Sequence, residues 1–295
     1  MTDSRRVGLI GVGLMGHGIA RNLLRHGHAL SFLDHPGNQP VDDLMAEGAT
    51  RLSSAADVAA AADVVILCVT GSPQVEAVLS EAGGVLDGLA PGSIVIDCST
   101  AIPSSTVAIA ERVVERGGRF CDAAMTRTPK EAEEGRLNLI VGAASELFAE
   151  IRPLLESFAE AITHVGPVGS GHRVKLLHNF VSLGFSAVLA EASAAARQAG
   201  ISPQALVEVL GNGGGAGVVF ERLKPFILAD DASSFRFSLS NADKDIGYYQ
   251  QMVAELGASH QAADGIAGLY RQAVEQGHGQ AAVPELVALL AEASR

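Results

Sequence analysis

The sequence predicts an α/β domain built on a doubly wound parallel sheet, followed by an all-helical domain that begins with a long interdomain helix. Two observations carry this prediction. In the first half, short apolar or β-branched runs alternate with amphipathic segments, which is typical of β-α-β units. From about residue 174 onward the apolar pattern is helical and no strand-like run follows.

The expected strands and helices of the first half follow from this alternation. Pro103 suits the first turn of the third helix. The expected strands are 7–10, 29–33, 64–69, 94–96 and 120–123, with 137–141 and 162–165 extending the sheet, and helices are expected at 14–26, 75–79 and 104–116.

The second half begins with a helix expected at 174–199, which is rich in alanine and apolar on most faces, as buried helices are. Gly200 is a suitable end for it. Glycines and a proline cluster at 165–171, so we expect a dinucleotide-binding domain at 1–167 and a helical substrate and dimerisation domain at 168–295. The further helices are expected at 203–210, 220–228, 243–256, 262–276 and 284–293.

Composition narrows the class of protein. The chain has 295 residues, 48% of them apolar, and a formal net charge of −12, which disfavours nucleic-acid binding because phosphates would be repelled. The three cysteines lie in apolar runs without metal-ligand spacing, so we expect reduced buried thiols and no metal site. No apolar stretch is expected to reach the length needed to span a membrane, and no signal peptide is expected, so we expect a soluble cytoplasmic protein.

The run from Gly11 to Gly16 fits G-x-G-x-x-G, with its glycines at 11, 13 and 16. Gly11 permits a tight turn, Gly13 lets the backbone approach a pyrophosphate, and Gly16 lets helix and strand pack closely. The motif alone is weak evidence, since a flexible turn can have the same sequence. Here it follows an apolar strand and opens a helix, which is the context of a Rossmann dinucleotide site.

Asp34 ends the second expected strand, where a carboxylate binds the ribose hydroxyls of NAD and repels the extra phosphate of NADP. Residues 35–39 supply no Arg or Lys to hold that phosphate. We therefore expect NAD as the cofactor. The alternative is that Asp34 merely begins a turn before Pro36.

Lys175 and Asn179 are four residues apart on the long helix, so they share a face. Burying a lysine ammonium among apolar neighbours costs free energy unless the charge is paired or serves a function. One such function is general base catalysis by the amine. Position alone supports equally well a lysine that extends its ammonium to solvent from the helix end.

At this point the chain resembles the β-hydroxyacid dehydrogenases, which include 3-hydroxyisobutyrate dehydrogenase, tartronate semialdehyde reductase and sulfolactaldehyde reductase and are related to 6-phosphogluconate dehydrogenase. The resemblance covers nearly the whole chain. Its motifs are Gly8–Gly16 with Asn22-Leu-Leu, Asp97-Cys-Ser-Thr followed by Pro103, Gly169-x-Gly171 with Lys175 and Asn179, and Lys244-Asp245.

The resemblance implies a role for each motif. Lys175 would be the general acid or base, and Asn179 would orient the substrate. Ser99 and Thr100 would lie beside the substrate carboxylate and the nicotinamide ribose, and Lys244 would approach the cofactor from the helical domain. The remaining cofactor contacts implied are Leu14, Met15, Val69, Thr70 and Gln74. Several of these residues follow the ends of neighbouring expected strands. Ligands of open α/β sheets bind at the carboxyl ends of the strands, so these positions agree with the implied roles.

The chain departs from the family at 122–128, where the common pattern Asp-Ala-Pro-Val-Ser-Gly-Gly is replaced by Asp-Ala-Ala-Met-Thr-Arg-Thr. In the family this turn binds the substrate carboxylate, which implies Thr126, Arg127 and Thr128 as substrate contacts. Because a guanidinium is a fork of donors, we expect Arg127 to hold an anionic head group, a sulfonate or a carboxylate. Sulfolactaldehyde reductases are similar at this turn. The alternative is that Arg127 points to solvent or to Glu131.

These observations predict an NAD-dependent oxidoreductase acting on a small 3-hydroxy acid or its C3 aldehyde, assembled as a homodimer or homotetramer. Two alternatives are a non-catalytic cofactor-binding interaction module and an enzyme that reduces cyclic imines. Relatives of both kinds lack the lysine, so the presence of Lys175 disfavours each.

Overall fold

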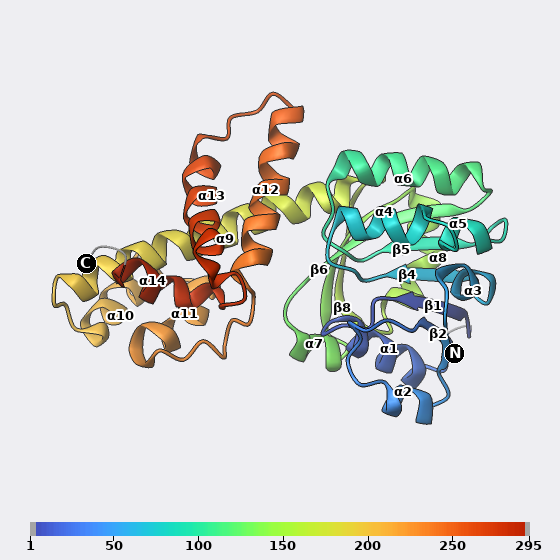
Figure 1. Ribbon diagram of the computed structural model, residues 1–295, viewed down its shortest axis with the longest axis horizontal. Coiled ribbons are helices and arrows are strands. Elements are labelled where there is room, and N and C mark those ends of the chain that lie inside the picture. The colour runs from blue at the N-terminus through green and yellow to red at the C-terminus, as the bar shows by residue number, and fades with distance from the viewer. Residues whose placement is uncertain (1–3, 293–295) are drawn as a thin grey trace. The chain divides into compact units, whose positions relative to one another are not determined.

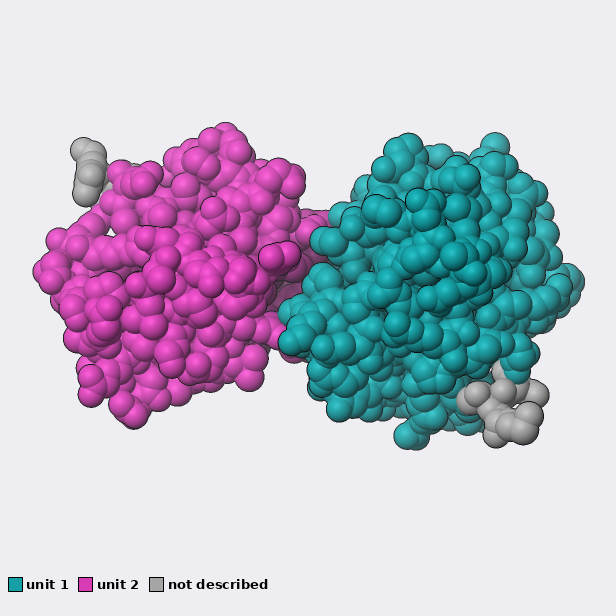
Figure 2. Space-filling model, turned by 90° about the horizontal axis from the view of Figure 1, so that it is seen from below, with its two compact units in different colours: residues 1–175 teal, residues 176–295 magenta. Residues whose placement is uncertain are grey.

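The computed structural model describes residues 4–292, which fall into two compact units, Met1–Lys175 and Leu176–Arg295. Figure 2 colours the two units separately. The change from one unit to the next lies inside a continuous helix, α9 (Ser170–Gln198), a few residues after the boundary that the sequence suggests at 167/168.

Unit 1 contains one eight-stranded sheet with the order β3-β2-β1-β4-β5-β6-β7-β8 (Figure 1). Neighbouring strands pair in parallel, except that β7 runs antiparallel to β6. The strands are β1 (Arg6–Ile10), β2 (Ala29–Leu33), β3 (Thr50–Leu52), β4 (Val64–Leu67), β5 (Ile94–Asp97), β6 (Arg119–Thr126), β7 (Leu137–Gly142) and β8 (Ala159–Gly166).

Helices cover both faces of this sheet, because its central strands are apolar on both. All four residues of β4, and all four of β5, are buried. One core lies under α1 (Gly16–Arg25), α2 (Asp42–Ala46), α7 (Pro129–Glu133) and α8 (Ser145–Leu155). The other lies under α3 (Ala55–Ala60), α4 (Ser72–Ser80), α5 (Val85–Gly88) and α6 (Pro103–Glu115). The doubly wound sheet predicted from the sequence is confirmed.

Two features of the sheet differ from the prediction. β3 was not expected, because it has three residues and two of them are exposed, so its sequence lacks an apolar run. The antiparallel direction of β7 was not expected either. The short connection through α7 turns the chain back beside β6, and an apolar run is the same whichever way the strand points.

Unit 2 is helical, and Figure 1 shows its helices in yellow to red. Beyond α9 it consists of α10 (Pro203–Gly211), α11 (Val218–Ala229), α12 (Leu239–Glu255), α13 (Gln261–Ala273), two short turns (Val274–His278 and Val283–Glu285) and α14 (Leu286–Glu292). Between residues 176 and 292 the described β-structure is one isolated bridge, Ser238 to Ala282. The fully buried Tyr270 fixes α13 to α9, because its hydroxyl donates to the Leu183 carbonyl at 2.7 Å.

Helix α9 corrects one expectation. By length and composition alone it could cross a membrane, with a mean hydropathy of 1.3 over its most apolar window, so the expectation that no stretch reaches the required length is wrong. However, 56% of that window is buried inside the protein, as in the core helix of a globular fold. Packing inside the protein therefore accounts for the buried part of this apolar window.

Candidate active site

The glycine turn between β1 and α1 has the geometry that a dinucleotide phosphate requires. Gly11 adopts φ +100°, and a Cβ on it would lie 2.2 Å from the Cys68 carbonyl oxygen. A Cβ on Gly16 would lie 1.9 Å from the Gly11 oxygen, so both positions require glycine for the fold. A Cβ on Gly13 would meet nothing within 4 Å. The space above Gly13 is open, and a pyrophosphate fits there against the first N–H groups of α1.

Asp34 follows β2 with its side chain 55% exposed, so the carboxylate is accessible to a ribose. Arg51, on the neighbouring strand β3, lies with its guanidinium 3.9 Å from that carboxylate. The sequence does not indicate Arg51, because it comes beside Asp34 only through the pairing of β2 with β3. A cation is therefore available beside the position where the extra phosphate of NADP would bind.

The loops after β4 and β5 are held together at the carboxyl end of the sheet. The Val69 amide donates to the Ser99 hydroxyl at 3.1 Å, and the Ile102 amide donates to the Ser72 hydroxyl at 2.7 Å. Ser99 is buried, whereas Thr70 and Gln74 are exposed. Because β4, β5 and β6 are adjacent and parallel, the predicted residues after these strands lie along one edge.

Asp122, on β6, holds the start of α9. Its carboxylate accepts hydrogen bonds from the Gly169 and His172 amides, both at 2.7 Å, and it is fully buried. A Cβ on Gly171 would lie 2.7 Å from the same carboxylate, which explains the glycine. Lys175 follows one turn later with 9% exposure. The position of the candidate acid or base is thus set by a buried carboxylate in the sheet.

Arg127 occupies a strained position at the end of β6. Its φ of +82° is in the left-handed region, where the family pattern has glycine. Its guanidinium contacts the Glu160 carboxylate on β8 and the Arg136 carbonyl rather than Glu131, and the side chain stays 29% exposed. The Glu131 carboxylate instead accepts the Thr128 amide at 3.0 Å and caps α7.

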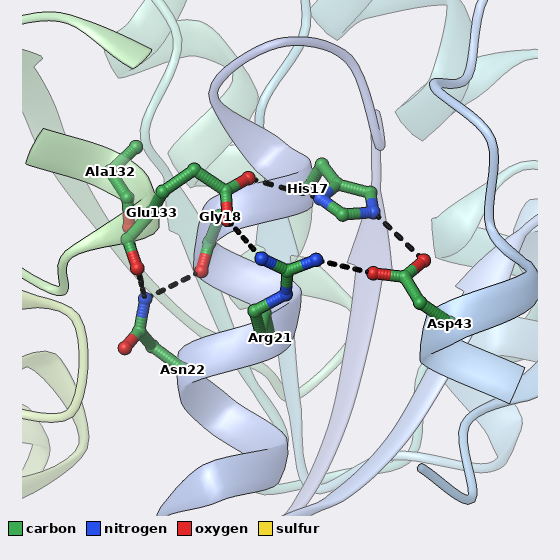
Figure 3. A network of polar contacts seen from close by, with 7 residues as sticks. All are labelled: His17, Gly18, Arg21, Asn22, Asp43, Ala132 and Glu133. Atoms are coloured by element: carbon green, nitrogen blue, oxygen red, sulfur yellow. Dashed lines mark hydrogen bonds and ion pairs between the residues drawn. The ribbon is translucent and has the colours of Figure 1, made fainter. Parts of the chain in front are cut away.

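A polar network joins α1 to α7 and α2 (Figure 3). Each ring nitrogen of His17 lies 3.1 Å from a carboxylate oxygen, one of Asp43 and one of Glu133. The Arg21 guanidinium donates to the other oxygen of each carboxylate, at 2.6 Å to Asp43 and 2.8 Å to Glu133. The Asn22 amide donates to carbonyls of Gly18, Ala132 and Glu133. The helix that follows the glycine turn is therefore fixed to the helix that follows Arg127 and Thr128.

In unit 2, the buried carboxylate of Asp245 connects two predicted site residues. It accepts from the Asn179 amide and from the Lys244 ammonium, each at 2.6 Å. The Lys244 ammonium also lies 4.8 Å from the centre of the Tyr248 ring. The sequence alone assigns no role to Asp245, because its partner Asn179 is 66 residues away.

Comparison with known proteins agrees with this geometry along the chain. Residues 6–166 match the family described as the NAD binding domain of 6-phosphogluconate dehydrogenase, and residues 169–290 match the NAD-binding domain of NADP-dependent 3-hydroxyisobutyrate dehydrogenase. This chain is a member of the β-hydroxyacid dehydrogenase family.

The relatives of this β-hydroxyacid dehydrogenase include two characterised enzymes. It is 33% identical to 2-(hydroxymethyl)glutarate dehydrogenase of Eubacterium barkeri over 84% of this chain and 82% of that protein. It is 32% identical to the NAD-dependent L-serine dehydrogenase of Pseudomonas aeruginosa over 94% of each. The crystal structure of Mycobacterium tuberculosis 3-hydroxyisobutyrate dehydrogenase with L-serine superposes with a TM-score of 0.86 at 26% identity, covering 97% of this chain and 99% of that one. The protein is thus a hydroxyacid dehydrogenase that uses a nicotinamide dinucleotide, NAD or NADP.

Proposed function

We propose that this β-hydroxyacid dehydrogenase transfers hydride between NAD and a small 3-hydroxy acid, or the corresponding C3 aldehyde, with Lys175 as the general acid or base. The observation that carries the proposal is the burial of Lys175 on the first turns of α9, anchored by Asp122 to the same sheet edge as Ser99. Serine, 3-hydroxyisobutyrate and 2-(hydroxymethyl)glutarate, which the relatives' names mention, share a primary alcohol two carbons from a carboxylate.

In the proposed mechanism a nicotinamide dinucleotide held by the glycine turn would supply the acceptor for the hydride that leaves the carbinol carbon. The Lys175 amine, in its neutral form, takes the hydroxyl proton as the carbonyl forms, and the ammonium returns it in the reductive direction. Ser99 and Thr100 hold the carboxylate and the nicotinamide ribose, and Asn179 orients the substrate. Leu14, Met15, Val69, Thr70, Gln74 and Lys244 are the proposed further cofactor contacts.

Two features support the cofactor assignment. The open space above Gly13 fits the pyrophosphate, and the exposed carboxylate of Asp34 fits a ribose diol and disfavours a 2′-phosphate. We therefore propose NAD in preference to NADP. We also propose residues 1–167 as the functional dinucleotide-binding domain and 168–295 as the substrate and dimerisation domain.

Arg127 is the proposed determinant of the substrate's head group, together with Thr126 and Thr128. Binding of a sulfonate or second carboxylate would require its guanidinium to leave Glu160, which is itself exposed and replaceable by solvent. If this is correct, Arg127→Ala raises KM for sulfolactaldehyde far more than for 3-hydroxyisobutyrate. If the variant and the native enzyme had equal KM values for both substrates, Arg127 would not determine the head group.

A homo-oligomer in the cytoplasm is the proposed state of the protein. Leu177, Val181 and Val188 of α9 are 47%, 69% and 60% exposed, an apolar stripe that a second copy can cover. Light scattering tests the assembly, and a monomer at micromolar concentration would contradict it. Cell fractionation tests the location.

The deciding experiment follows NADH absorbance with 3-hydroxyisobutyrate, L-serine, 2-(hydroxymethyl)glutarate, tartronate semialdehyde and sulfolactaldehyde. Lys175→Ala should abolish turnover and retain NADH binding, whereas the control Lys224→Ala, at a half-buried lysine paired with Glu221, should retain both. Turnover by Lys175→Ala would contradict the assigned base. NADH binding without turnover of any substrate by the native protein would favour an interaction module instead.

A further inference from the structure

One buried histidine in unit 1 has no part in the proposed chemistry. His172 lies in the first turn of α9 with 0% exposure. Its Nε2 lies 3.2 Å from the Ser99 carbonyl oxygen and its Nδ1 lies 2.7 Å from the Thr106 hydroxyl. One imidazole thus joins the start of α9 to the loop after β5 and to the first turn of α6.

The hydrogen-bond partners determine how this imidazole is used. A carbonyl oxygen only accepts, so Nε2 must donate to Ser99. The Thr106 hydroxyl can donate to Nδ1 or accept from it. The ring therefore has a fixed orientation, with each nitrogen bonded to a different segment of the chain.

Two buried carboxylates flank the same ring. Asp97 Oδ2 lies 3.9 Å from Nε2 and has no hydrogen-bond partner, and Asp122 Oδ2 lies 4.0 Å from Nδ1. The other oxygen of Asp97 accepts the Ser99 amide at 2.9 Å. Ser99 is therefore held from both sides, by Asp97 at its amide and by His172 at its carbonyl.

Resting on the proposed function, we propose that His172 is a positioning residue that fixes the Ser99–Thr100 loop relative to Lys175. The chain of contacts is short. Asp122 binds the His172 amide, the imidazole binds the Ser99 carbonyl, and the Ser99 hydroxyl binds the Val69 amide. Lys175 follows three residues after His172 in the same helix. The imidazole is the link between the segment that holds substrate and the segment that carries the base.

The test compares His172→Leu with His172→Gln and with a matched control. Leucine removes both hydrogen bonds, whereas a glutamine amide can donate to the Ser99 carbonyl and accept from Thr106. The control is His164→Leu, since the half-buried His164 on β8 likewise bonds a backbone carbonyl, that of Ala143 at 2.9 Å, away from the β5 loop. All variants are assayed as full-length protein for kcat, KM, NADH affinity and thermal midpoint.

We expect His172→Leu to lower kcat roughly tenfold or more, since a displacement of about 1 Å at a reacting group costs up to about 100-fold. NADH affinity should stay within about twofold, because the glycine turn is untouched. His172→Gln should restore kcat to within a few fold, and His164→Leu should leave it unchanged. Native kcat in His172→Leu, or equal losses in His172→Leu and His164→Leu, would overturn the proposal.

A second measurement separates this proposal from the proposed function. Amide hydrogen exchange of the segment 98–106 should be faster in His172→Leu than in the native protein or His164→Leu, whatever substrate the enzyme uses. If the native protein turns over no hydroxy acid, the proposed function fails while this measurement still decides the role of His172. Should His172→Leu not fold, Thr106→Val replaces it, and native exchange and kcat in that variant would refute the proposal.

Discussion

The Asp245 carboxylate holds Asn179 with one oxygen and the Lys244 ammonium with the other, each at 2.6 Å. Asp245 is 2% exposed, so solvent has little access to its carboxylate. This arrangement fixes the direction of the Asn179 amide, which leaves its carbonyl oxygen near Nδ1 of His178 at 3.0 Å. Two residues proposed to contact substrate and cofactor thus share a single buried anchor.

Replacing Asp245 with Asn should therefore disturb both. An amide offers one acceptor instead of two and no charge, and hydrogen bonds to charged groups contribute about 2 kcal/mol each. We expect kcat to fall about tenfold or more and the free energy of unfolding to fall by about 2 kcal/mol. The control is Asp243→Asn on the same helix, whose nearest basic partner, Arg271, is 3.9 Å away. Similar kinetics for the two variants would count against an anchoring role.

Two glycines of the same turn should respond oppositely to alanine. The Cβ added by Gly13→Ala would lie in open space, so we expect the thermal midpoint of the native protein. The same Cβ would contact the pyrophosphate, so we expect NADH binding to weaken at least about tenfold. Gly16→Ala places a Cβ 1.9 Å from the Gly11 oxygen, so we expect loss of folded protein. Circular dichroism and fluorescence titration of NADH check both. Native NADH affinity in Gly13→Ala would mean that the phosphates bind elsewhere.

Cofactor preference should depend on Asp34 and Arg51 together. In the native protein the Arg51 guanidinium lies 3.9 Å from the Asp34 carboxylate. Asp34→Ser removes the charge that repels a 2′-phosphate and releases this guanidinium to bind that phosphate. We expect kcat/KM with NADP to rise at least about tenfold, by removal of a like-charge repulsion of a few kcal/mol. Adding Arg51→Ala to Asp34→Ser should reverse most of that gain. If the double variant uses NADP as well as the single one, Arg51 has no part in the preference.

Stability in acid should reveal the network around Asp43. The Arg21 guanidinium, with His17, lowers the pKa of the Asp43 carboxyl from 3.8 to about 2. Since the folded pKa lies below the unfolded one, the ionised form stabilises the fold above about pH 4 and this contribution is lost as pH falls toward 2. The thermal midpoints of native protein and Asp43→Asn should therefore converge in that range. Asp42→Asn, at the exposed neighbour, should show no such convergence.

The three cysteines should be unreactive in the native state. Burial raises the pKa of Cys68 to about 12 and those of Cys98 and Cys121 well above their usual range. Because the thiolate is the reactive form, we expect no thiol to react with an aromatic disulfide reagent within minutes at neutral pH. All three should react in denaturant. Cys98 and Cys121 are buried as expected, whereas Cys68 is half-buried, so fast reaction of Cys98 or Cys121 in the native protein would contradict their burial.

Local patterns in the sequence are sufficient to predict most strands of the sheet and the glycine turn. The strands β1, β4 and β5 are runs buried on both faces, β2 alternates between buried and half-buried residues, and Gly11 and Gly16 are required by contacts within the turn and its neighbouring strand. The edge strand β3 has no comparable signal, because two of its three side chains are exposed.

The parts of the candidate site that escaped prediction depend on contacts between distant segments. Asp245 meets Asn179 across 66 residues, and His172 meets Ser99 across 73. Arg51 lies beside Asp34 only because β3 pairs with β2. No spacing rule connects such positions, since their distance is set by how the sheet and the helices pack.

The positive φ of Arg127 has an evolutionary consequence. A side chain in the left-handed region costs about 1 kcal/mol relative to glycine, which the family pattern has at this turn. A lineage that replaces this glycine with arginine gains a charge and loses about that much folding stability in the same mutation. Such a replacement is therefore open only to an ancestor whose stability exceeded the threshold for folding by more than this amount.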